Sequence, residues 1–196
     1  VAKVTIISQP KTQPMPWAFD SQSLDTHQAS GTLGSCIQVR DLFYNVPARK
    51  RFLKSAKTEQ LHIEEVFRRQ ALAAPRVGFS LKIDDRIVYE LAPCLSFDQM
   101  MPRLKKIFSN TFAEQAHFIE EYHGDLTLKG WVTKQAGARR QPDRQYCFVN
   151  NRCVKDKLFS HAVNSAQQSL IQQGLYPAYA LYLSLPESDV DVNVHP

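Results

Sequence analysis

The side chains best suited to chemistry are cations gathered in three short stretches. One stretch follows a predicted strand and starts a predicted helix, and it contains Arg152, Lys155 and Lys157. Lysine and arginine rows neutralise nucleic-acid phosphates and release counterions, which gives affinity without sequence preference. Backbone N–H groups at a helix start also attract phosphate. The spacing therefore predicts a DNA-binding surface at Arg152, Lys155 and Lys157.

A second basic stretch leaves two interpretations open. Its cations precede any acidic side chain at a predicted helix start: Arg49, Lys50, Arg51, Lys54 and Lys57. Such a row either binds phosphate or forms a solvated helix face whose alkyl stems cover apolar surface. We retain Lys54 as a candidate DNA-binding residue. The third group falls in one predicted loop and consists of Arg139, Arg140 and Arg144.

A glycine-rich turn runs from Gly31 to Ser35, just before a predicted strand. Glycines let backbone N–H groups approach a phosphate closely, and the Ser35 hydroxyl adds a donor. An ordinary turn has the same composition. On these residues alone, an ordinary turn is the preferred interpretation.

Sequence motifs for other chemistry are absent. The chain has no paired carboxylates, no G-x-S-x-G and no Walker A sequence. The four cysteines form no C-x-x-C pair and the six histidines no H-E-x-x-H. Neither a structural zinc nor a disulfide framework is expected, and reduced thiols fit the cytosol better. We therefore assign no catalytic residue and no metal ligand.

Hydrophobic periodicity outlines the elements that must position these residues. Residues 9–30 hold several prolines and predict a long exposed loop or a loose hairpin. Strands are predicted at 4–7, 35–42, 77–83, 87–91, 118–122, 126–132, 145–149, 152–154 and 178–185. Helices are predicted after Pro47, from a cap at Thr58 to Pro75, from Pro102, and from 158 to a cap at Gly174. The second of these helices should bury Ile63, Val66, Phe67 and Ala71.

Bulk composition fits a globular protein and leaves its partners open. The chain has 196 residues, of which 43% are hydrophobic and 22% charged, ordinary values for a soluble domain. No apolar run approaches the roughly 18 residues of a membrane span, so no membrane partner is expected. A net charge of +5 suits nucleic-acid binding and plain solubility equally.

Three separate motifs then narrow the choice of family. They are DLFYNVPARKRFL at 41–53, QYCFVNNR at 145–152 and VDVNVHP at 190–196. In type and order they resemble the signatures of the MutL family of DNA mismatch-repair ATPases. The resemblance implies an α+β fold, in which residues 1–93 are the C-terminal portion of a GHKL-type ATP-binding domain. Residues 94–196 would then form a transducer domain like ribosomal protein S5 domain 2.

The same resemblance implies where ATP would bind. The family places a Gly-Thr pair beside the ATP pocket, and the matching positions are Gly34 and Ser35. Its magnesium-holding Asn, its water-activating Glu and its adenine-reading motif would lie upstream of Val1, and its phosphate-sensing Lys just beyond Pro196. The chain, which begins with Val, is thus expected to be a piece of a longer ATPase. ATP and Mg²⁺ would serve that parent protein, while this piece alone would be inactive.

The function expected from the resemblance is part of mismatch repair. The parent protein would dimerise, bind DNA non-specifically through a groove that includes the position of Lys157, and act in the cytoplasm. Its partners would be the mismatch-recognition protein MutS and a downstream nuclease or helicase. Two alternatives remain open: an ATPase/transducer piece of a type II topoisomerase, and a nucleic-acid-binding module without ATP linkage.

Overall fold

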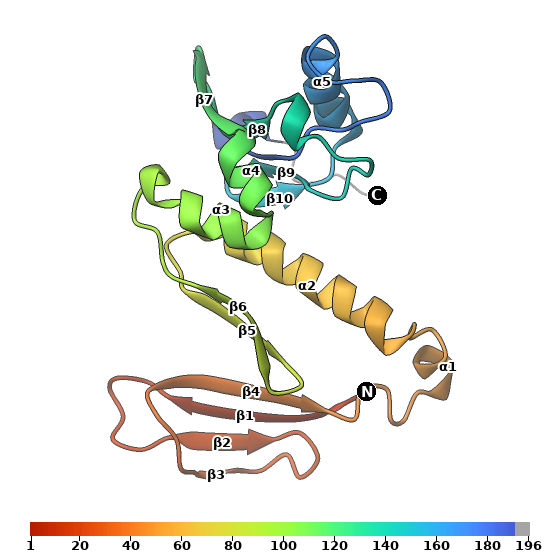
Figure 1. Cartoon of the computed structure of the whole chain (residues 1–196). Coiled ribbons are helices and arrows are strands. Elements are labelled where there is room, and N and C mark those ends of the chain that lie inside the picture. The colour runs from red at the N-terminus through yellow and green to blue at the C-terminus, as the bar shows by residue number, and fades with distance from the viewer. Residues whose placement is uncertain (191–196) are drawn as a thin grey trace. The chain divides into compact units, whose positions relative to one another are not determined.

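The computed structural model describes residues 1–190 and divides the chain into two compact units, Val1–Leu61 and His62–Pro196 (Figure 1). Residues 191–196, which hold most of the third motif, lie outside the described residues. Within the second unit, residues before and after position 93 share one hydrophobic core, because Leu72, Leu91 and Leu104 pack in the same cluster. The expected family boundary after residue 93 stays a prediction.

The first unit is built on an antiparallel sheet of order β3-β2-β1-β4. Its strands are β1 (Lys3–Gln9), β2 (Trp17–Asp20), β3 (Thr26–Gln28) and β4 (Gly34–Arg40). The predicted loose hairpin at 9–30 is thus present as β2 and β3. Ile6 pairs with Ile37 and Val4 with Val39, yet Ile37 is 65% and Val39 58% exposed. One face of this sheet therefore carries apolar side chains that water reaches.

The first motif forms a run of turns that ends in the short helix α1 (Pro47–Lys50). Pro47 occupies the first helical position, as predicted, because its missing N–H has no partner to lose there. The next helix, α2 (Ala56–Ala73), begins two residues before the predicted Thr58 cap. The prediction was wrong because the Ser55 hydroxyl caps this end instead and accepts a hydrogen bond from the Thr58 N–H at 3.3 Å.

The buried face of α2 also differs from the predicted one. Phe67 packs against the core and Ala71 is buried, but Ile63 and Val66 are exposed. The side chains that α2 buries are Arg68, Ala71 and Leu72. Periodicity missed Arg68 because hydrogen bonds to Glu64, Glu65 and Tyr89 satisfy its charge inside the protein.

After α2 the chain forms the hairpin of β5 (Phe79–Ile83) and β6 (Arg86–Leu91). Its turn residues Asp84 and Asp85 both adopt positive φ, 46° and 64°. Paired positive φ values match the twist of the flanking strands, and this hairpin was predicted. Two short helices follow, α3 (Met101–Ile107) and α4 (Asn110–Gln115), after the 3₁₀ turn η1 (Phe97–Gln99).

The second unit centres on a five-stranded sheet of order β10-β9-β11-β8-β7. The strands are β7 (Ala116–His123), β8 (Leu126–Thr133), β9 (Gln145–Val149), β10 (Arg152–Val154) and β11 (Tyr179–Ser184), with η2 (Gln135–Gly137) after β8 and η3 (Glu187–Asp189) after β11. Helix α5 (Lys157–Gln167) connects β10 to β11, which runs parallel to β9. It ends well before the predicted cap at Gly174. The predicted strands and this β-α-β connection are confirmed.

The central strand β11 explains how both faces of this sheet are covered. Ala180 and Tyr182 point into the core that α2, α3 and α4 share, whereas Tyr179 and Leu181 contact Phe159 and other residues on the opposite face. The sequence of a strand that is buried on both faces is a nearly continuous run of apolar residues. Next to it, Gly130 of β8 has φ +146°, and an added Cβ would lie 2.1 Å from the Ala180 carbonyl oxygen.

One buried arginine connects the helices to the hairpin. The Arg103 guanidinium on α3 donates to the carbonyl oxygens of Ala71 at 2.6 Å, Val77 at 2.6 Å and Ala92 at 2.5 Å. The Ala71 carbonyl belongs to the last turn of α2, where helix carbonyls lack partners within the helix. Arg103 is only 2% exposed, so water cannot replace these bonds.

We expect Arg103→Met to lower the free energy of unfolding by about 3 to 5 kcal/mol, because it leaves several buried carbonyls unpaired. Urea unfolding followed by circular dichroism measures the change. Arg86→Met, at an exposed position that begins β6, is the matched control and should stay within about 0.5 kcal/mol. Equal stability of the two variants would contradict a structural role for Arg103.

Candidate nucleic-acid interface

Lys155 and Lys157 line one groove in the second unit. The groove has a volume of about 590 Å³. Its walls come from β9 and the segment before it, the end of β10, the β10–α5 connection, α5, and the start of β11 with the segment before it. The lining residues are Pro142, Gln145, Cys147, Val154, Lys155, Asp156, Lys157, Ser160, His161, Asn164, Tyr176 and Tyr179. Arg152 is exposed at the start of β10, outside this lining.

Two asparagines form the β9–β10 turn. Asn150 and Asn151 adopt positive φ, 47° and 65°, so the tight turn forms without glycine. The Asn150 side chain also donates to the Leu185 carbonyl at 2.9 Å and accepts from the Leu185 N–H at 3.1 Å. This pair of bonds holds the turn against the end of β11.

Asp156 starts α5 and changes how the groove can hold an anion. Its carboxylate accepts a hydrogen bond from the Phe159 N–H at 2.7 Å, as an N-cap residue does. That backbone donor is therefore engaged. The cationic groups available to an anion at this end are the ammonium groups of Lys155 and Lys157.

The polar residues of the groove follow the helical period of α5. His161 and Asn164 lie four and seven residues after Lys157, on the same side of the helix. From the opposite wall, Gln145 donates to Asn164 at 3.5 Å and to the Pro177 carbonyl at 3.1 Å. These uncharged residues were not predicted from the charged clusters, although their spacing from Lys157 was a usable signal.

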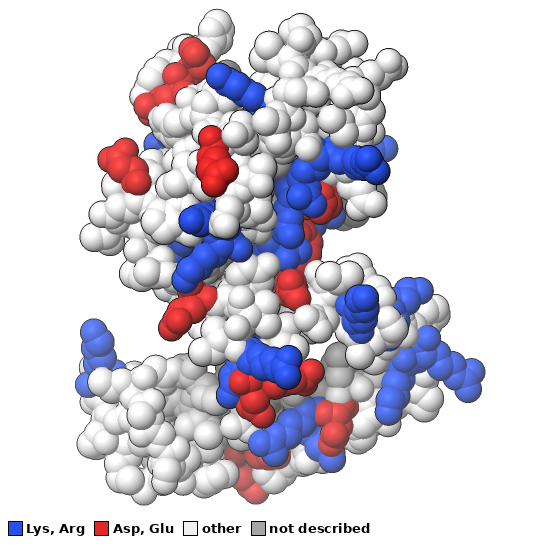
Figure 2. All heavy atoms as spheres, viewed as in Figure 1, with Lys and Arg blue, Asp and Glu red and all other residues white. Residues whose placement is uncertain are grey.

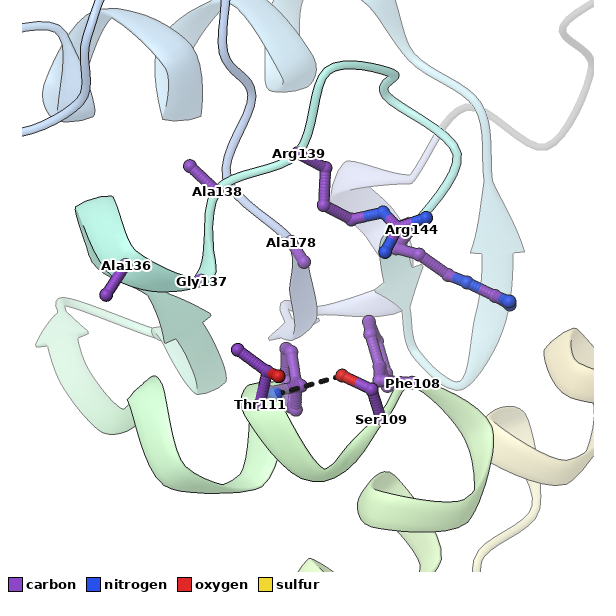
Figure 3. A pocket seen from close by; sticks show the side chains of 10 residues that line it. Phe108, Ser109, Thr111, Ala136, Gly137, Ala138, Arg139, Arg144 and Ala178 are labelled. Carbon is purple, nitrogen blue, oxygen red and sulfur yellow. Dashed lines mark hydrogen bonds between the residues drawn. The ribbon is translucent and has the colours of Figure 1, made fainter.

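The predicted arginine loop lies beside a different pocket of about 270 Å³. Figure 3 shows the Arg139 and Arg144 side chains on the same side of this pocket, with the Ser109 hydroxyl accepting from the Phe112 N–H. Arg139 makes two bonds to Asp143, at 2.8 and 2.9 Å. Burial alone would raise the pKa of Asp143, but the hydrogen bonds and the positive charge of Arg139, together with a backbone hydrogen bond and the Arg144 charge, lower that pKa overall. Part of the loop's positive charge is therefore neutralised internally.

Charges of both signs occur on the face that Figure 2 shows. Some lysine and arginine side chains there lie close to aspartate or glutamate side chains, and others form groups of their own. The candidate phosphate site is therefore defined by the groove that Lys155 and Lys157 line, rather than by the charge pattern of the surface.

The other predicted site residues belong to the first unit. Gly34 begins β4 with φ +112°, which favours glycine, and an added Cβ would meet open space. The Ser35 hydroxyl lies 2.8 Å from the Ser8 hydroxyl. Lys54 is exposed between α1 and α2, and its N–H donates to Glu59 at 2.8 Å. The structure thus brings together Lys155 and Lys157, while Gly34, Ser35 and Lys54 stay untested as ligands.

Residues 1–190 contain no group of three His, Cys, Asp or Glu side chains that could hold a metal ion. Within the same residues, no helix is long and apolar enough to cross a bilayer.

Comparison with known sequences points to one family. Residues 104–196 match the family model described as "DNA mismatch repair protein, C-terminal domain". The DNA mismatch repair protein MutL of Histophilus somni is 38% identical over all of this chain, which covers 32% of that protein. MutL of Actinobacillus succinogenes is 40% identical, again over all of this chain and 31% of the relative. The chain spans about a third of the length of the curated relatives it matches.

Comparison with solved structures confirms the α+β fold class. The N-terminal domain of a DNA repair protein superposes with a TM-score of 0.82 at 21% identity, over 100% of this chain and 64% of that one. The Aquifex aeolicus MutL ATPase domain complexed with ADP gives a TM-score of 0.73 at 24% identity, over 95% of this chain and 68% of that one. Identities this low show the shared fold alone.

Cys147 in the groove wall should be chemically inert. Burial raises its pKa to about 12, so at pH 8 the thiol stays protonated and only the thiolate attacks electrophiles. We expect iodoacetamide at pH 8 to modify the exposed Cys36 at least tenfold faster than Cys147. Peptide mass spectrometry gives both rates, and Cys36→Ser is the control that removes the fast site. Equal rates for Cys36 and Cys147 would contradict the burial of the groove wall.

Proposed function

We propose that this chain, which belongs to the MutL family of DNA mismatch repair proteins, supplies a sequence-independent DNA-binding groove to a larger mismatch repair protein. The observation that carries the proposal is the meeting of Lys155 and Lys157 in one groove beside the uncharged polar face of α5. Lysines act as point charges toward phosphate and carry no sequence information. Arg152 and Lys54 are further phosphate contacts in this proposal.

The larger protein binds ATP with Mg²⁺ and uses it to drive dimerisation. The support is a relative in fold, the Aquifex aeolicus MutL ATPase domain, whose structure holds ADP. The residues of this chain fit only part of such a site. Gly34 leaves open space, but the Ser35 hydroxyl already has Ser8 as a partner. We therefore give Gly34 and Ser35 a flanking role and derive no catalytic step from this chain.

The partners follow from membership of a mismatch repair family. The larger protein receives the mismatch signal from a MutS-type recognition protein and passes it to a downstream nuclease or helicase in the cytoplasm. A groove that holds DNA without reading sequence suits this task, because a mismatch arises in any sequence context. Pull-down of purified MutS with the full-length protein, with and without ATP, tests the first partner.

Lys157→Glu should weaken DNA binding to every sequence alike, since it replaces an attractive charge by a repelling one. The slope of log K against log salt should become shallower by about one unit. Fluorescence anisotropy with duplex DNA at several salt concentrations measures the slope. Lys105→Glu is the matched control, because Lys105 is exposed on α3 outside the groove lining. An unchanged slope for Lys157→Glu with an intact circular dichroism spectrum would place the DNA path elsewhere.

The chain on its own should not hydrolyse ATP. Phosphoryl transfer needs a metal ion and a positioned water, and residues 1–190 offer no cluster of metal-binding side chains. Phosphate release from ATP should stay at background, with Ser35→Ala indistinguishable from the unmodified chain. Turnover that survives a second purification and falls in Ser35→Ala would contradict this expectation.

A further inference from the structure

The DNA groove continues into a second cavity along α5. This cavity has a volume of about 290 Å³ and is lined by the C-terminal part of α5 and the segment up to Pro177. His161, Asn164 and Tyr176 line both the groove and the cavity. The two spaces therefore adjoin, with Lys155 and Lys157 at one end and the cavity at the other.

The chemistry of the cavity differs sharply from that of the groove. No Lys, Arg, Asp or Glu occurs among its lining residues. Amide groups come from Gln167, Gln172 and other residues of the same segment, while Ile171 and Pro177 add buried apolar surface. The Gln167 Oε1 atom is buried and has no hydrogen-bond partner among the described residues. The lining suits an uncharged group with apolar faces and polar edges.

We propose that this cavity binds an unpaired nucleobase of a DNA strand whose phosphates lie on Lys155 and Lys157. The proposal rests on the DNA-binding role of the groove and adds a subsite to it. A base presents donors and acceptors at its edge, which glutamine and asparagine amides match, and a π-face, which an aromatic ring such as Tyr176 stacks against. A phosphate has no cation to bind in the cavity, so the cavity selects the base rather than the backbone.

The walls of the cavity are held in place before any ligand arrives. The Gln172 N–H donates to the Gln135 side chain at 2.6 Å, which anchors the segment after α5 to η2. Gln145 holds Asn164 and the Pro177 carbonyl from the other side. A preformed cavity loses little conformational entropy on binding. In duplex DNA the base edges are paired, so only an unpaired base can enter.

The decisive experiment compares the affinities of two single strands that carry the same number of phosphates and differ only in their bases. Oligo(dT) carries bases with weak mutual stacking, whereas an abasic strand of equal length carries none. We expect the chain to bind oligo(dT) about five- to tenfold more tightly than the abasic strand in fluorescence anisotropy at one salt concentration, because stacking of one base supplies a difference of this order. Tyr176→Leu, which removes the stacking ring, should remove most of this difference. Gln167→Leu and Gln172→Ala, which remove partners of the base edge, should each reduce the difference and leave affinity for the abasic strand unchanged.

Gln70→Ala, at an exposed position of α2, is the matched control and should keep the full difference. Equal binding of the two strands by the unmodified chain would overturn the base subsite. So would variants that lose affinity for both strands to the same extent. If either occurs while Lys157→Glu still flattens the salt dependence, the groove proposal stands and only the subsite fails. An unchanged salt slope in Lys157→Glu would instead reject the groove itself.

Discussion

The second unit depends on the hydrogen bonds that the Arg103 guanidinium donates to backbone carbonyls. Three separate backbone segments end near it: the last turn of α2, the start of the β5–β6 hairpin, and the exit from that hairpin. Each carries a carbonyl that would otherwise be buried without a donor. An apolar residue would fill the volume but satisfy none of them. One planar side chain with several donors thus specifies how α2, the hairpin and α3 meet.

That junction is connected through the central sheet to the groove that Lys155 and Lys157 line. Tyr182 of β11 donates to the Leu72 carbonyl of α2 at 3.0 Å, and Tyr146 of β9 donates to Glu65 at 2.9 Å. The opposite face of β11 packs against α5 through Phe159 and Tyr179. Lys157 therefore starts a helix whose position is fixed by a strand buried on both sides, and Lys155 lies just before that helix. A site carried by rigid elements holds its charges at a defined spacing.

Local chemistry made much of this arrangement predictable. Strand alternation and the helix start at Pro47 each depend on neighbouring residues, and the structure agrees with both. The predictions that failed concerned features that depend on contacts between segments far apart in the sequence. A buried Arg68 is visible only when its acidic and phenolic partners are placed, and the polar lining of the groove comes from segments far apart in sequence. Charge clusters identified Lys155 and Lys157, but only the fold shows which uncharged residues accompany them.

Gly130 has a consequence for how this chain can vary. An added Cβ would lie 2.1 Å from the Ala180 carbonyl oxygen, and its φ of +146° is unfavourable for any other residue. The obstacle is backbone in the middle of the sheet, which cannot rotate aside as a side chain can. Every missense change at this codon therefore introduces the same steric conflict, whatever the chemical character of the new residue. Substitutions of Gly130 should therefore act through loss of folded protein.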